Sequence, residues 1–173
     1  MMDYTIGQRI IHPAHGVGQI TAIQREELVT GYQRYYVIRF ANKQLLVRIP
    51  FKRVPDLGLR RIMSKEKAQQ VLNVLRALPR QLPSDHKKRQ QQVQDLIFSG
   101  YPLKIAQAVR ELTWHRRRKK RLLLEERRLL DEGRNLLVQE MALALDDPDG
   151  KVSQAVDAAL ATAVAQGEAQ ATA

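Results

Sequence analysis

Residues 35–40 decide the fold of the first part of the chain: they read Tyr-Tyr-Val-Ile-Arg-Phe, the most strand-like hexamer of the 173 residues. Aromatic and β-branched residues favour strands over helices. Stretches of similar character lie on both sides, at 6–12, 19–28 and 44–49, and Gly and Pro residues punctuate them. Roughly four or five short strands in so little chain predict a small, strongly bent sheet.

The pattern changes to helical spacing after about Ser64, which is a suitable N-cap for a helix that ends near Ala77. Ser84 or Asp85 caps a second predicted helix that runs to Phe98. Pro102 suits the first turn of a third helix, a long helix follows at about 123–145, and Gly133 inside it permits close contact with a neighbouring helix. The Ala-rich end predicts one more, weaker helix whose last residues fray.

These patterns predict an α+β protein with two domains. The first is a small β-barrel of the SH3 or Tudor type at residues 1–56, and a linker follows at 57–63. An all-α helical bundle is expected at 64–147, with an Ala-rich C-terminal helix or tail at 148–173.

Positive charge is concentrated in the helical part. The chain carries a net charge of +11, from 29 Lys and Arg against 18 Asp and Glu. Nine of these excess charges fall between Arg80 and Arg121, where Lys87-Lys88-Arg89 and the unbroken run from Arg116 to Arg121 form two clusters. A run of charge is usually only a solvated face, but two clusters in one helical module favour contact with phosphate groups.

Alternation along the last strand of the first domain puts Leu45, Val47 and Ile49 on one face and Leu46 and Arg48 on the other. Arg48 is therefore expected to be exposed on a rigid strand. It is either a binding residue or an ordinary solubilising arginine.

Composition excludes several classes of protein. The absence of Cys removes disulfides and thiolate metal sites, and His12 and His15 beside Pro13 suit a turn better than a metal site. There is no phosphate-binding Gly loop, nucleophile elbow or His and carboxylate constellation, so we expect neither an enzyme nor a cofactor. No apolar stretch is long enough to span a membrane, so a soluble intracellular protein is expected.

Several motifs, in the right order, resemble the CarD/CdnL family of bacterial transcription regulators that bind RNA polymerase. They lie at residues 6–18, 35–38, 46–50, 54–60, 99–106 and 136–140. The resemblance covers nearly the whole chain to about Leu145. It implies a Tudor-like N-terminal domain, shared with transcription-repair coupling factors, that binds the β subunit of RNA polymerase.

By position in this resemblance, Arg48 matches a polymerase-contacting arginine, and its neighbours Ile49 and Pro50 belong to the same expected contact. The second arginine of the family falls near Arg25 or Glu26. The helical domain would contact promoter DNA, mostly its backbone and minor groove, at the upstream edge of the −10 element. There it would act on the stability of the open complex.

Expected DNA-binding residues are His86, Lys87, Lys88, Arg89, Arg116 and Arg117. His86 stands where family members often place a Trp that wedges into the minor groove. The only tryptophan, Trp114, lies in a different helix and fits a partly buried anchor better than a wedge. We expect a monomer located at the nucleoid in the cytoplasm.

A second hypothesis is an SH3-like protein with a basic helical arm that binds RNA or the ribosome and does not bind RNA polymerase.

Overall fold

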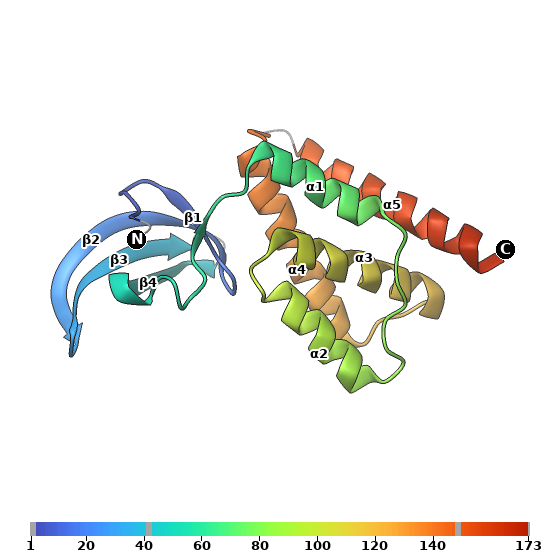
Figure 1. The fold of residues 1–173 in the computed structure, drawn as a ribbon, viewed down its shortest axis with the longest axis horizontal. Coiled ribbons are helices and arrows are strands. Elements are labelled where there is room, and N and C mark those ends of the chain that lie inside the picture. Colours follow the sequence, from blue (N-terminus) through green and yellow to red (C-terminus); the bar gives the residue numbers. More distant parts are fainter. Residues whose placement is uncertain (1–2, 41–42, 148–149, 173) are drawn as a thin grey trace. The chain divides into compact units, whose positions relative to one another are not determined.

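A computed structural model describes residues 3–40, 43–147 and 150–172, and its architecture is α+β (Figure 1). The chain divides into two compact units, Met1–Ile62 and Met63–Ala173. The first unit contains the strands and the second contains the five described α-helices.

The first unit is one antiparallel sheet. Its strands are β1 (Arg9–His12), β2 (Gly16–Val29), β3 (Tyr32–Phe40), β4 (Leu45–Pro50) and β5 (Arg60–Arg61), in the order β4-β3-β2-β1-β5. The predicted hexamer lies within β3. Among the described residues β4 and β5 are the two edges of this sheet, so the hydrogen-bonded strand order is linear and does not close into the predicted barrel.

The core of this unit lies on one face of the sheet. Tyr36, Ile38 and Phe40 alternate along β3 and pack with Ile20 and Ile49. A short 3-10 helix, η2 (Phe51–Arg53), follows β4. Its Phe51 ring stacks on Tyr36 with the ring centroids 3.8 Å apart.

The structure differs from the predicted linker at 57–63, because Arg60 and Arg61 form β5 and pair with Ile11 and Ile10 of β1. Leu59 is also buried, and its carbonyl accepts a hydrogen bond from the Tyr4 hydroxyl at 3.1 Å. A strand of two residues is too short to show an alternating pattern, so the sequence gives no sign of it.

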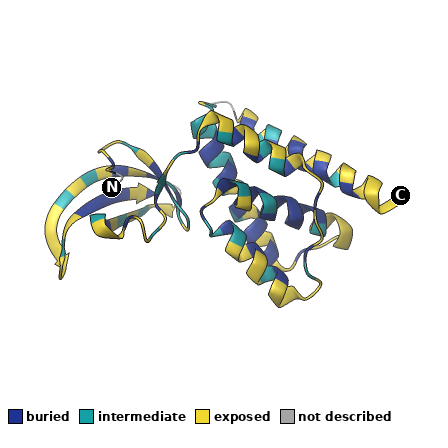
Figure 2. Ribbon diagram, in the orientation of Figure 1, coloured by how far each residue is buried: buried dark blue, intermediate teal, exposed yellow. Residues whose placement is uncertain are grey.

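The helices of the second unit are α1 (Lys65–Arg76), α2 (His86–Ile97), α3 (Pro102–Lys119), α4 (Leu124–Ala144) and α5 (Lys151–Thr172). Two predicted caps are confirmed. The Ser64 hydroxyl accepts from the Lys67 amide at 3.2 Å, and the Asp85 carboxylate accepts from the Lys88 amide at 2.8 Å. Buried residues, dark blue in Figure 2, are frequent along α3 and the facing parts of its neighbours.

The predicted close contact at Gly133 is also confirmed. A Cβ atom on this residue of α4 would lie 2.9 Å from Val109 Cγ2 on α3 and 3.3 Å from Ile97 Cδ1 on α2. Only a glycine lets the three helices meet at this distance.

The C-terminal segment is more ordered than predicted. Residues 148 and 149 fall outside the described residues, but α5 extends to Thr172 and packs against α1 and α3. Val152, Val156 and Leu160 belong to the same hydrophobic core as the other helices. The segment predicted as a weak helix or tail is therefore an integral helix of the second unit, since small side chains let it lie close to its neighbours.

Candidate functional site

The first candidate surface is the face of the sheet opposite the core of the first unit. Arg48 is exposed there, as the alternation predicted, and its Nε donates a hydrogen bond to Gln24 Oε1 at 3.0 Å. Arg48 pairs with Val37 and Gln24 pairs with Tyr35, so this bond runs diagonally across β3. It fixes the direction of the guanidinium on a rigid strand.

The other residues expected beside Arg48 lie elsewhere. Ile49 is only 2% exposed and faces the core, so its side chain is not available to a partner. Pro50 is half-buried at the end of β4. Gln24 shares the face of Arg48, and side chains alternate along a strand. Arg25, the next residue of β2, therefore lies on the opposite face of the sheet, where it is aligned with Arg34 of β3.

Glu26 is exposed in the irregular part of β2, where the register shifts between Arg25 and Val29. It lines a surface depression together with Arg25 and Arg34. The Arg34 guanidinium lies 4.3 Å from the centre of the Phe51 ring. Sequence reasoning missed Gln24, because a partner two strands away in the sheet can be identified only once the register is known.

The histidines of the first unit form part of a turn. The His12 Nδ1 accepts a hydrogen bond from the Ala14 amide at 3.1 Å, and the His12 and His15 rings stack with their centroids 4.5 Å apart. Burial, together with the nearby His15 and Lys43, lowers the pKa of His12 to about 4. Within the described ranges, no group of three or more His, Asp or Glu side chains is placed to hold a metal ion.

The second candidate surface is a pocket of about 630 Å³ in the helical unit. It lies where the beginning of α2, the end of α3 and the beginning of α4 meet. Its lining includes His86, His115, Arg118, Lys119, Arg121 and Leu123. The pocket thus joins His86 to the run Arg116 to Arg121, two features that are separate in the sequence.

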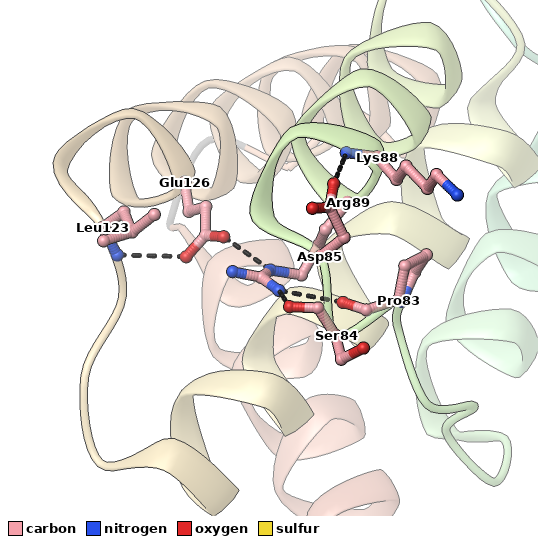
Figure 3. A network of polar contacts seen from close by, with 7 residues as sticks. All are labelled: Pro83, Ser84, Asp85, Lys88, Arg89, Leu123 and Glu126. Atoms are coloured by element: carbon pink, nitrogen blue, oxygen red, sulfur yellow. Dashed lines mark hydrogen bonds and ion pairs between the residues drawn. The ribbon is translucent and has the colours of Figure 1, made fainter.

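A buried ion pair holds this pocket together (Figure 3). Arg89 is 6% exposed, and its Nε lies 2.6 Å from Glu126 Oε1, while its Nη1 donates to the Pro83 and Ser84 carbonyls at 2.8 and 2.9 Å. Glu126 Oε2 accepts from the Leu123 amide at 3.0 Å. One arginine therefore ties the start of α2 to the start of α4.

Arg89 is consequently not part of the exposed basic surface that its sequence neighbours suggested. A guanidinium that already pairs with a carboxylate and two carbonyls in the interior is not available to a phosphate. Arg110, also in the charged region, is buried too and pairs with Glu111 at 2.6 Å.

The remaining predicted DNA-binding residues are exposed. Lys87 and Lys88 line a separate shallow depression on α2 with Gln91, Gln92 and Asp95. Arg116 is exposed near the end of α3, and the neighbouring Arg117 pairs with Glu168 of α5 at 2.5 Å, with both side chains largely in water.

His115 lies beside the buried pair, in the wall of the pocket. Burial lowers the pKa of His115 and the Arg89 charge lowers it further, while Glu126 opposes the shift. The imidazole is therefore biased toward its neutral form, and the positive charge of the pocket comes from its arginines and lysine.

Trp114 is the anchor that the sequence favoured. Its side chain packs against α5, where a Cβ atom on Gly167 would lie 2.9 Å from the ring. It is buried, and the Arg118 guanidinium lies 6.0 Å from the ring centre. In this position Trp114 cannot act as a wedge against bases.

Comparisons with known proteins agree with this architecture. Residues 4–63 match the model of the CarD-like/TRCF RID domain, and residues 70–157 match the model of the CarD C-terminal domain. The chain belongs to the CarD/CdnL family. A Bacillus subtilis (strain 168) protein named "Putative transcription factor YdeB" is 29% identical over 140 residues, which cover 80% of this chain and 90% of that protein.

Membership places this CarD-like chain among transcription regulators. The RID domain is a Tudor-like, polymerase-interacting type, and here it corresponds to the sheet unit that carries Arg48. The helical match ends at residue 157, so the part of α5 that contacts Trp114 and Arg117 lies beyond it. Among the described residues, no helix has the length and apolar character that a membrane span requires.

Proposed function

We propose that this protein connects the β subunit of RNA polymerase to promoter DNA and thereby modulates the stability of the open complex. It would do so as a monomer at the nucleoid, near the upstream edge of the −10 element. The observation that carries the proposal is the pair of distinct surfaces, one in each compact unit of a CarD-family chain.

The proposed polymerase contact centres on Arg48. Its Nε is held by Gln24, and its terminal nitrogens have no partner among the described residues. Two parallel hydrogen bonds from such a guanidinium suit a carboxylate of the partner. Among the described residues its strand, β4, is also an edge of the sheet, and an edge strand can take a partner strand.

A pull-down with the isolated β-subunit lobe tests this contact. Arg48→Glu should weaken retention of the full chain by about 30-fold or more, as expected for a central interface residue. Arg9→Glu makes the same charge change at an exposed position on β1, and it should leave retention unchanged. Equal binding by wild type and Arg48→Glu would remove Arg48 from the interface.

Arg25→Glu and Glu26→Lys, made separately, then decide whether the other face of the sheet takes part. A loss of retention in either variant would extend the contact around the edge of the sheet. Normal retention in both would confine it to the Arg48 face.

The proposed DNA contact is the cationic surface of the helical unit. His86, Arg118, Lys119 and Arg121 line one pocket. Lys87 and Lys88 line a separate depression on α2, and Arg116 and Arg117 are exposed near the end of α3. Such contacts go mainly to phosphates, so they give affinity and orientation with little reading of base sequence. Arg89 contributes by fixing the pocket walls.

Salt dependence tests this surface. Arg118→Gln and Arg121→Gln should each reduce the slope of log K against log salt by about 1. Arg76→Gln, on α1, removes an exposed arginine away from the pocket and should leave the slope unchanged. If structured RNA binds at least as tightly as promoter DNA, and polymerase does not bind, the RNA- or ribosome-associated function replaces this one.

His86 occupies the position of the family's wedge residue, and a histidine buries less apolar surface there than a tryptophan. We therefore expect His86→Trp to lengthen the lifetime of the open complex on a weak promoter. An equal or shorter lifetime would show that position 86 does not touch the melted edge.

A further inference from the structure

Two adjacent leucines stand unusually exposed at the start of α4. Leu123 is 48% exposed and Leu124 is 75% exposed, the highest value among the large apolar residues that the structure describes. The preceding Leu122, by contrast, is buried in the helical core. Leaving two large apolar side chains in water has a free-energy cost, which points to a partner that covers them.

The surroundings of this leucine pair are cationic. Leu123 lines the pocket together with His86, Arg118, Lys119 and Arg121. The nearest acid in sequence, Glu125, has its carboxylate 3.2 Å from Arg128. An apolar pair surrounded by positive charge suits DNA as a partner. The cations can contact the phosphates, and the leucines can contact the apolar planes of the bases.

The leucine pair is also held firmly. The Leu123 amide donates to Glu126, whose other oxygen holds the buried Arg89, as Figure 3 shows. Lys120 adopts a left-handed conformation with φ of 60° and turns the chain between α3 and α4. Because the backbone is already fixed here, less conformational entropy is lost when a side chain is inserted between bases.

We propose that Leu123 and Leu124 form an apolar wedge that enters a weakly stacked or melted base step while the pocket cations hold the flanking phosphates. This inference rests on the proposed DNA contact and gives it a second feature. The insertion of leucine between base steps is a known way to kink or open a duplex. In this chain, where position 86 is a histidine, the leucine pair supplies the apolar surface.

The test compares binding of the full chain to a promoter duplex and to the same duplex with one mismatched step. A 2-aminopurine at that step reports unstacking by its fluorescence. Wild type should prefer the mismatched duplex by about tenfold and should raise the 2-aminopurine signal.

The double variant Leu123→Ser/Leu124→Ser should bind the paired duplex within about twofold of wild type, because the phosphate contacts remain. It should lose both the preference and the fluorescence rise. Position 123 is the N-cap of α4, where serine is favoured, so the variant is expected to fold. The buried Trp114 gives a direct check of folding by its emission.

Tyr101→Ser is the matched control. Tyr101 is 63% exposed and is the N-cap of α3, at the end of that helix far from the pocket. The control should retain the preference. If the double variant keeps the preference or wild type shows none, the wedge is refuted while DNA binding stands. If wild type binds neither duplex, the proposed function fails together with the wedge.

Discussion

Removing one partner of the buried Arg89–Glu126 pair should strongly destabilise the helical unit. In Glu126→Ala the Arg89 guanidinium, whose side chain is 8% exposed, loses the carboxylate that it pairs with, and the Leu123 amide loses its acceptor. An uncompensated buried charge of this kind costs about 3–5 kcal/mol. That is a large part of the roughly 5–15 kcal/mol that stabilises a typical domain.

A double-mutant cycle separates the pair from its surroundings. The double variant Arg89→Met/Glu126→Leu removes both charges together. Its free energy of unfolding should therefore fall by less than that of Arg89→Met or Glu126→Leu, each of which leaves one buried charge unpaired, and by far less than the sum of the two. We expect a coupling free energy of at least about 2 kcal/mol. Some loss remains in the double variant, because the Pro83 and Ser84 carbonyls lose their donor.

Urea unfolding followed by tryptophan fluorescence measures these changes. Trp114 is the only tryptophan and lies in the helical unit, so its emission reports on that unit and not on the sheet. If the loss of stability in the double variant equals the sum of the losses in Arg89→Met and Glu126→Leu, the coupling is refuted. A Glu126→Ala variant as stable as wild type would refute it as well.

Three further predictions concern packing and pH. Gly133→Val should lower the free energy of unfolding by about 1–3 kcal/mol in the same urea assay, because the new side chain meets Val109. Gly167→Val should displace α5 from the Trp114 ring, giving a red-shifted emission in the native state and a loss of about 1–3 kcal/mol. Between pH 6.5 and about 4 the unfolded chain binds a proton at His12 before the folded chain does, so the sheet unit should lose stability as the pH falls through this window. Urea unfolding followed by tyrosine circular dichroism measures this loss, and His12→Asn should reduce it; an unchanged pH dependence in that variant would contradict the assignment.

The regular elements could be predicted from local patterns. The hexamer within β3 and the caps at Ser64 and Asp85 are properties of a few neighbouring residues. The strand β5 and the docking of α5 could not, since each depends on a distant partner: β5 on β1, and Gly167 on Trp114. The propensities of neighbouring residues do not predict contacts between segments that are distant in the sequence.

The same division applies to the candidate site. Alternation is enough to place Arg48 on the open face of the sheet. The charge pattern groups Arg89 with Lys87 and Lys88, although Arg89 precedes the buried Val93 and Ile97 at helical spacing. That spacing was a signal of burial. Its partner Glu126, on another helix, could be found only from the fold.

Recruitment of labelled promoter DNA to an immobilised β-subunit lobe is the most direct test of the central claim. The lobe alone should not retain the DNA, and the lobe with the full chain should. Either Arg48→Glu or the pair Arg118→Gln/Arg121→Gln should abolish retention, the first by releasing the protein from the lobe and the second by releasing the DNA from the protein. If wild-type protein stays on the lobe and no DNA stays with it, the protein does not connect the two, and the account is contradicted.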